Sequence, residues 1–250
     1  MKGILTSDTN MVRRFLKKHH FSVSSSKDRY ITYKSTELTE LVVMTGAAGQ
    51  RAYGGARILG GMSEVTFIAS VGTAAALVKT VRIGSVMLCE RLRKLEGDMA
   101  LWSPSSVGEL KIAKLEPMEM LFRHIDESER KLFTGSMVTA PHIATNSNMR
   151  AWLGRRLGVD AMDQDASYIA LACSEMSIPF AIIRGITSQE SSNFSLSRYR
   201  AGSSTRSAKS KRFITPVGIF DYIKFRLGVR TASTRMDQVL TRINALSLHE

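Results

Sequence analysis

The chain has 250 residues with a formal net charge of +13, and 44% of its residues are hydrophobic, enough for the core of one large domain. No apolar run approaches the roughly 18 residues that a membrane-spanning helix needs, and the N-terminal residues lack the long apolar run of a signal peptide. These features argue against a membrane or secreted protein. We therefore expect one soluble, cytoplasmic domain (residues 1–250) with no membrane partner.

The positive charge alone would permit binding to nucleic acid, to a membrane surface or to phosphate. It is dispersed along the chain, however, and no aromatic residues interleave with it to mark a groove for a single strand. We therefore do not expect a nucleic-acid partner. A cluster of basic residues at 198–212 is interpreted as a solvated loop, with a lid for an anionic ligand as the alternative.

Cysteine usage points to a reducing compartment. Cys89 and Cys173 lie in separate apolar runs, far apart in the sequence, and neither takes part in a metal-ligand spacing. Both are predicted to be buried thiols, and no bound metal is expected.

In the first hundred residues, short apolar runs alternate with helical patterns. Val12, Phe15 and Leu16 recur at helical spacing with basic residues between them, which indicates a helix at 11–19. A helix of small residues is predicted at 50–59. Strands are predicted at 3–6, 21–26, 29–34, 40–45, 65–70 and 84–89.

The second half of the chain continues the alternation after a weak signal at 97–110. The elements predicted there are a helix at 116–125, a strand at 131–139, helices at 146–157 and 166–173, and a strand at 179–183. Residues 189–212 are rich in Ser and Arg and predict a mobile surface loop. Two amphipathic helices, at 216–227 and 234–246, are predicted to end the chain.

This alternation predicts an α/β layer fold. Three predicted strands end in glycine and hydroxyl residues, at 45–46, 70–73 and 184–188. Small residues let a ligand approach the backbone, although tight turns need the same glycines with no ligand present. Because ligands of open α/β sheets lie beyond the carboxyl ends of the strands, residues 160–188 are the first candidate for a site.

The order of these segments resembles the nucleoside phosphorylase and nucleosidase superfamily, over roughly residues 1–190. Its members include purine nucleoside phosphorylase, methylthioadenosine/S-adenosylhomocysteine nucleosidase and hopanoid-associated phosphorylase-like proteins. The matching motifs are the small-residue turn and helix at 45–59, Gly72–Leu77 followed by Gly84-Ser85, Gln164-Asp165, Pro179-Phe180 and Arg184–Ser188.

The resemblance implies a three-layer α/β/α fold with a twisted, mixed central sheet, and assembly into a homo-oligomer. It also implies cleavage of the N-glycosidic bond of a purine-type nucleoside, with water or inorganic phosphate as the nucleophile and no other cofactor. The transition state resembles an oxocarbenium ion. The leaving base therefore needs a proton from a general acid, and the ribose needs hydroxyl contacts that strengthen as charge develops.

Several residues take family roles by their place in these motifs. Asp165 replaces the glutamate that accepts hydrogen bonds from the ribose hydroxyls, with a shorter reach, and Gln164 replaces a methionine that packs against the sugar. Thr73 and Ala74 lie on a loop that touches ribose and base. The base pocket is lined by the segment that corresponds to Pro141, His142 and Ile143.

The departures from the family pattern leave activity open. Ser188 stands where the family has its general acid, usually aspartate, and a serine hydroxyl has too high a pKa to donate a proton efficiently near neutrality. Met11 stands where nucleosidases have a glutamate that positions water, with Asp8 and Asn10 nearby. The alternative is therefore a catalytically impaired member that binds a nucleoside-like ligand or serves as a scaffold.

Three acidic or basic positions also have plainer interpretations. The alternative interpretation of Asp165 is a helix cap, since aspartate is favoured there. Asp163 is interpreted as a solvated acid in the first helical turn, and Arg184 as a structural residue at the end of a strand.

Overall fold

The computed structural model describes residues 1–95, 107–110, 132–192 and 216–245. The predicted helix at 116–125 and most of the predicted loop at 189–212 lie outside these residues. The strands are β1 Lys2–Thr6, β2 Ser22–Lys27, β3 Tyr30–Lys34, β4 Leu41–Thr45, β5 Phe67–Ala76, β6 Val86–Leu95, β7 Val107–Leu110, β8 Leu132–Thr139, β9 Ala161–Asp163 and β10 Phe180–Ser188. The helices are α1 Thr9–Lys18, α2 Arg51–Gly60, α4 Ser147–Leu157, α5 Ala166–Glu175 and α7 Pro216–Ala245.

The described strands form one mixed sheet in the order β10-β6-β8-β9-β5-β1-β4-β3-β2, with β7 beside β6. Strand β10 also pairs with β5, so that β5, β10, β6, β8 and β9 close into a ring. Strands β4, β1, β5 and β10 run parallel, with Thr45 beside Thr6 and Val71 beside both Thr6 and Ile183. Their carboxyl ends therefore open on the same edge of the sheet.

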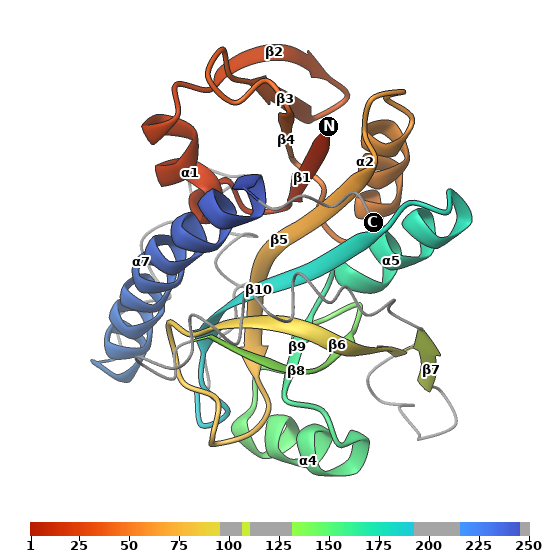
Figure 1. Cartoon of the computed structure of the whole chain (residues 1–250). Coiled ribbons are helices and arrows are strands. Elements are labelled where there is room, and N and C mark those ends of the chain that lie inside the picture. Colours follow the sequence, from red (N-terminus) through yellow and green to blue (C-terminus); the bar gives the residue numbers. More distant parts are fainter. Residues whose placement is uncertain (96–106, 111–131, 193–215, 246–250) are drawn as a thin grey trace.

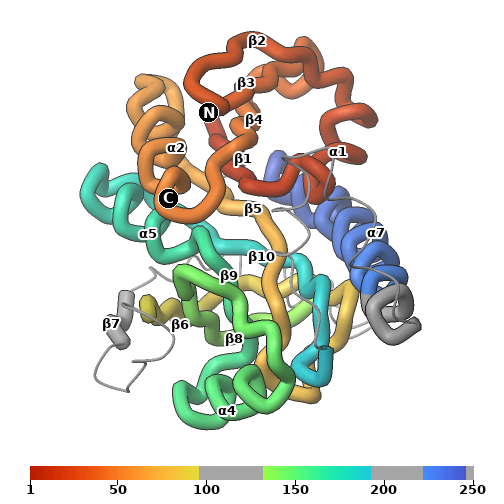
Figure 2. The backbone as a smooth tube through the Cα atoms, turned by 180° about the vertical axis from the view of Figure 1, so that it is seen from behind, coloured from red at the N-terminus to blue at the C-terminus, as the bar shows by residue number. Residues whose placement is uncertain are grey.

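Helices cover both faces of the sheet, and each face has its own apolar cluster. On one face α1 and α7 pack through residues such as Phe15 and Met236, and on the other α2 and α5 pack through Ala56 and Ile169. Figures 1 and 2 show these two helix pairs on opposite sides of β5 and β10, with α4 at the far end of the molecule. The three-layer α/β/α fold with a mixed central sheet is therefore confirmed.

Local sequence explains the position of α1. Met11, Val12, Phe15 and Leu16 are its buried residues, at the spacing that one helical face requires. Asp8 caps the first turn, because its carboxylate accepts a hydrogen bond from the backbone N–H of Asn10 at 3.0 Å.

The strands that carry the candidate site are longer than their sequence pattern predicts. Strand β5 continues from Ser70 to Ala76, and β10 continues from Ile183 to Ser188, with every residue of β10 buried. The glycine and hydroxyl residues therefore lie inside the strands and not after them. Parallel pairing between β5 and β10 extends both strands, and the sequence of either one alone does not reveal it.

The short strand β9 was not predicted, because it has only three residues and its acidic end suggested the beginning of a helix. It pairs with β8 and with β5, so tertiary pairing defines it.

The prediction of two C-terminal helices is wrong, because α7 is one continuous helix over the predicted break. Gly228 lies in the predicted gap, and a Cβ there would come within 2.4 Å of the Cγ2 atom of Ile83. The glycine thus allows close packing without ending the helix, and Ala232, which is fully buried, continues the apolar face.

Both cysteines are buried and free, as predicted. Burial raises the pKa of the Cys89 thiol to about 12, and it does the same for Cys173. Over the described part of the chain, no helix combines the length and the apolar composition needed to cross a membrane.

Candidate functional site

A buried ion pair lies at the centre of the candidate site. Arg184 on β10 donates from Nε to Asp163 Oδ2 at 2.8 Å, and each side chain is only 1% exposed. Its Nη1 atom donates to the carbonyl oxygen and the hydroxyl of Ser70 on β5, at 2.9 and 3.0 Å. Gly72 eases the fit of the guanidinium, because a Cβ at residue 72 would lie 3.3 Å from Arg184 Nε, closer than an ordinary van der Waals contact. Arg184 therefore ties β10, β9 and β5 together, a structural role as predicted.

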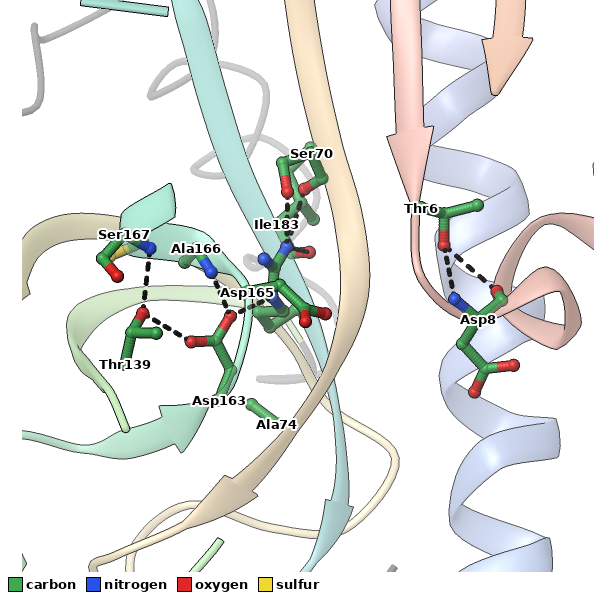
Figure 3. A network of polar contacts seen from close by, with 12 residues as sticks. Thr6, Asp8, Ser70, Ala74, Thr139, Asp163, Asp165, Ala166, Ser167 and Ile183 are labelled. Carbon is green, nitrogen blue, oxygen red and sulfur yellow. Dashed lines mark hydrogen bonds and ion pairs between the residues drawn. The ribbon is translucent and has the colours of Figure 1, made fainter. Parts of the chain in front are cut away.

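Asp163 also fixes the start of α5, which corrects its interpretation as a solvated acid. Its carboxylate accepts hydrogen bonds from Thr139 Oγ1 at 2.7 Å and from the backbone N–H of Ala166 at 3.0 Å (Figure 3). Thr139 in turn accepts from the N–H of Ser167 at 3.0 Å. These contacts satisfy N–H groups of the first helical turn, which otherwise lack partners.

Because Asp163 does the capping, the neighbouring carboxylate is left for another role. Asp165 is the residue at the N-cap position of α5, but its side chain makes no capping hydrogen bond. Its Oδ1 atom accepts instead from the N–H of Gly49, at 2.5 Å, in the turn that follows β4. The interpretation of Asp165 as a simple helix cap is therefore wrong.

Burial raises the pKa of Asp165 above its ordinary value, and the nearby Asp163 carboxylate raises it further. Arg184, a hydrogen bond from the Ser7 side chain and the Gly49 N–H act in the opposite direction but are weaker together. Ser7 follows β1, so Asp165 lies where the carboxyl ends of β1 and β4 meet the start of α5. A carboxylate in such a place gains strongly from any cation or hydroxyl donor that a ligand brings.

The turn after β4, whose Gly49 N–H donates to Asp165, requires glycine at two positions. Gly46 has φ +96°, and a Cβ there would lie 2.1 Å from the carbonyl oxygen of Arg29. Gly49 has φ +58°, in the left-handed region. The sequence shows this turn plainly, but not that its backbone N–H reaches a carboxylate 116 residues further along the chain.

Thr73 and Ala74 lie within β5 and not on a loop as predicted. Thr73 is beside Gly185 in the sheet, and Ala74 is beside Ile186. Ser188 lies beside Ala75 after a register shift in β10. Strand pairing therefore brings the predicted residues of β5 and the end of β10 together.

The predicted base-pocket segment lies between β8 and α4. Gln164 donates from Nε2 to the carbonyl oxygen of Pro141 at 2.8 Å, which links two of the predicted site segments. Pro141 and His142 are exposed, whereas Ile143 is buried in the apolar cluster beneath α4. The structure thus connects Gln164 to this segment, while His142 projects from it into solvent.

Sequence reasoning missed Arg150, which has no exposed surface although it lies in the first turn of α4. Its Nε donates to the carbonyl oxygen of Ala144 at 2.6 Å. Its Nη1 donates to Ser188 Oγ at 3.2 Å and to the carbonyl oxygen of Gln189 at 2.7 Å. A basic residue on a helix is usually exposed, so the sequence pattern carried no signal for this buried one.

Met11, at the position expected for a water-positioning glutamate, belongs to the core. It is 1% exposed, and its Cε atom would be 2.4 Å from a Cβ added to Gly185. Asp8, the nearest acid along the chain, is occupied as the cap of α1. Across the described residues, no group of three or more His, Cys, Asp or Glu side chains could hold a metal ion.

Breaking the buried ion pair should strongly destabilise the protein. The change Arg184→Met leaves the Asp163 carboxylate buried without its cation, which should lower the free energy of unfolding by about 3–5 kcal/mol. Urea unfolding followed by circular dichroism measures the loss. The control is Glu175→Gln, which removes the exposed ion pair of Glu175 with Arg57 and should leave the midpoint nearly unchanged. Equal small effects of the two changes would contradict the role given to Arg184.

Comparison with known proteins agrees with this architecture. The chain is similar to the structure of futalosine hydrolase from Helicobacter pylori strain 26695, with a TM-score of 0.73 and 12% identity over 98% of this chain and 97% of that one. It is also similar to 5'-methylthioadenosine/S-adenosylhomocysteine nucleosidase from Neisseria meningitidis in complex with methylthio-immucillin-A, with a TM-score of 0.72 and 14% identity over 98% and 99% of the two chains.

A third similar structure is the corresponding nucleosidase from Colwellia psychrerythraea 34H in complex with adenine. Its TM-score is 0.71, with 15% identity over 98% of this chain and 94% of that one. At such identities the likeness establishes the fold. No curated protein matches the chain.

The family itself follows from the sequence. The profile described as the phosphorylase superfamily matches residues 4–215, which is most of the chain and includes part of β1, the Gly49 turn, Asp165 and Ser188. This agrees with the order of motifs that predicted a nucleoside phosphorylase or nucleosidase. The chain belongs to the phosphorylase superfamily.

Proposed function

We propose that this protein cleaves the N-glycosidic bond of a purine-type nucleoside, with water or inorganic phosphate as the nucleophile. Membership of the superfamily supports this reaction, as do similar structures described as hydrolases and nucleosidases of nucleosides. The observation that carries the proposal is Asp165. It is a buried carboxylate that is not needed to cap its own helix, at the edge of the sheet where ligands of such folds bind.

Asp165 is suited to the sugar because of its surroundings. Ribose hydroxyls would donate hydrogen bonds to a carboxylate that is poorly solvated in the free protein, as its raised pKa reflects. Positive charge then develops on the sugar ring in the transition state. The attraction between that charge and Asp165 is stronger than in the ground state, which is the condition for catalysis.

The base is proposed to lie toward Ser188. Thr73 and Ala74 would form the floor of the pocket, and the segment from Pro141 to Ile143, joined to Gln164, would form its wall. In this proposal the sugar lies at the start of α5 and the base at the end of β10, as the order of motifs suggests.

A second candidate function is binding of a nucleoside-like ligand without turnover, or a scaffold role. The observations that favour it are the burial of Met11 in the core and the hydroxyl at position 188 in place of an acid. In this candidate Asp165 still binds the sugar, but the N-glycosidic bond is not cleaved.

We also propose that the protein acts in the cytoplasm as a homo-oligomer. Helices α2 and α5 pack against each other, and each has an exposed apolar side chain, Ile58 at 48% and Leu171 at 39%. Exposed apolar side chains on neighbouring helices support association between protein chains.

The reaction is tested by incubating the protein with methylthioadenosine, S-adenosylhomocysteine, inosine and adenosine, each with and without phosphate. Chromatography of the free base measures turnover. We expect base release from at least one nucleoside, and dependence on phosphate separates a phosphorylase from a hydrolase. Saturable nucleoside binding with no base release from any of the four would instead establish the binding function.

Asp165→Asn should reduce base release while it stabilises the fold. Loss of the charge removes transition-state attraction, for which a fall in kcat of roughly 10²-fold is expected. Because the pKa of Asp165 is raised in the folded protein, the folded state binds the proton more tightly, and stability falls as pH rises toward that pKa. The asparagine side chain does not titrate, so the variant does not lose stability in this way. Its unfolding free energy should therefore exceed that of the unmodified protein only slightly near pH 4, and by the full amount above the raised pKa of Asp165.

The matched control is Asp163→Asn, two residues away, which weakens the buried ion pair and should lower stability at pH 8. Urea unfolding at pH 5 and pH 8 compares the two variants with the unmodified protein. An Asp165→Asn variant that is less stable at pH 8 and retains full activity would overturn the role given to Asp165.

A further inference from the structure

Arg150 joins Ala144, the residue that follows the proposed base wall, to the end of β10 through three hydrogen bonds from one buried guanidinium. The Nε–H group holds the Ala144 carbonyl at 2.6 Å, and Nη1 reaches both the Ser188 hydroxyl and the Gln189 carbonyl. Such a fork fixes the direction of each donor, which a flexible ammonium does not. The position of Ser188 is therefore set by a rigid cationic group.

The direction of the bond between Arg150 and Ser188 has one consequence for the proton of the serine. An arginine side chain has only donors, so the Ser188 oxygen must accept and its own hydrogen must point elsewhere. Within the described residues the Ser188 hydroxyl donates no hydrogen bond to the protein, although it is only 5% exposed. A buried donor of this kind needs an acceptor that the described residues do not supply, and an acceptor atom on a bound ligand can fill that place.

We propose that Arg150 is a positioning residue that makes Ser188 a hydrogen-bond donor to the leaving base. This inference rests on the proposed function. In the step concerned, the bond between the anomeric carbon and the base nitrogen breaks, and the bonding pair goes to the base. The nucleophile's oxygen forms the new bond to the anomeric carbon, and where water is the nucleophile it gives up a proton to solvent. Ser188 stabilises the electron-rich base by donating a hydrogen bond and keeps its proton, and solvent protonates the base after departure.

The same geometry specifies what a carboxylate would do at position 188. An acid placed there would lie against the Arg150 guanidinium, which would hold its pKa below the usual range and keep it ionised at neutral pH. An ionised carboxylate only accepts hydrogen bonds and could not serve the leaving base. An asparagine of the same shape would accept from Arg150 through its oxygen and present its NH₂ group to the base.

Two variants of equal size test this directly, Ser188→Asn and Ser188→Asp. We measure kcat and KM at pH 7 with whichever of the four nucleosides the unmodified protein cleaves fastest, and the unfolding midpoint of each variant. We expect Ser188→Asn to exceed Ser188→Asp in kcat by at least about tenfold, since only the amide can donate. If Ser188→Asp is as active as Ser188→Asn or more so, the proposal is overturned, because position 188 then works as a general acid free of Arg150.

A second measurement decides the matter if either larger side chain prevents folding. Arg150→Lys keeps the charge but loses the fork, and it is made both alone and together with Ser188→Ala. Alone it should lower kcat by about tenfold with a smaller change in KM, and in the Ser188→Ala background it should have little further effect on kcat. An equal fall in both backgrounds would show that Arg150 only supports the fold.

The unmodified protein, assayed in parallel, distinguishes failure of the proposed reaction from failure of the role given to Arg150. If it releases no base, the proposed reaction fails and the inference fails with it. If it releases base and the variants do not show the expected pattern, the reaction stands and only the role of Arg150 is refuted.

Discussion

The ion pair between Arg184 and Asp163 is the interaction on which the rest of the site depends. A cation and an anion, each 1% exposed, are costly to bury unless their donors and acceptors are used, and here Nε and Nη1 of Arg184 and both oxygens of Asp163 make hydrogen bonds. Arg184 reaches across to Ser70, and Asp163 holds Thr139 and the first turn of α5. The pair thereby sets where β5, β9 and β10 meet and where α5 begins.

That arrangement leaves Asp165 in an unfavourable position for folding. Asp163 already has the arginine and caps the helix, so Asp165 is buried with hydrogen-bond donors but without a full counter-charge, and its pKa is raised. Residues held in such unfavourable states are often those that function requires. A cationic sugar in a transition state would supply the missing partner, which links the energetics of the fold to the proposed chemistry.

Much of the fold could be predicted from the sequence because the signals were local. The periodicity of Val12, Phe15 and Leu16 identified α1, and the buried run of β4 followed by glycine identified the turn to α2. What could not be predicted depended on distant partners. Pairing with neighbouring strands creates β9 and lengthens β5, and Gly228 serves close packing against Ile83 within a helix that continues through it.

The candidate site divides in the same way. Asp165 and Ser188 were identified because each occupies a place in a motif, and the match of the superfamily profile to residues 4–215 supports that reasoning for the family. Ser7, the Gly49 N–H and Arg150 were missed, because each reaches the site from a distant part of the chain and none carries a local pattern. Asp163 was misread because its burial comes from Arg184, which lies 21 residues away.

We propose that Asp165 and Ser188 belong to one nucleoside site, with the sugar at Asp165 and the base at Ser188. A crystal structure of the protein with a carbon-linked adenosine analogue, which cannot be cleaved, tests it most directly. We expect ribose hydroxyls within hydrogen-bond distance of the Asp165 carboxylate and the imidazole edge of the base within the same distance of Ser188 Oγ. A nucleoside bound elsewhere, or bound there with sugar and base exchanged, would contradict it.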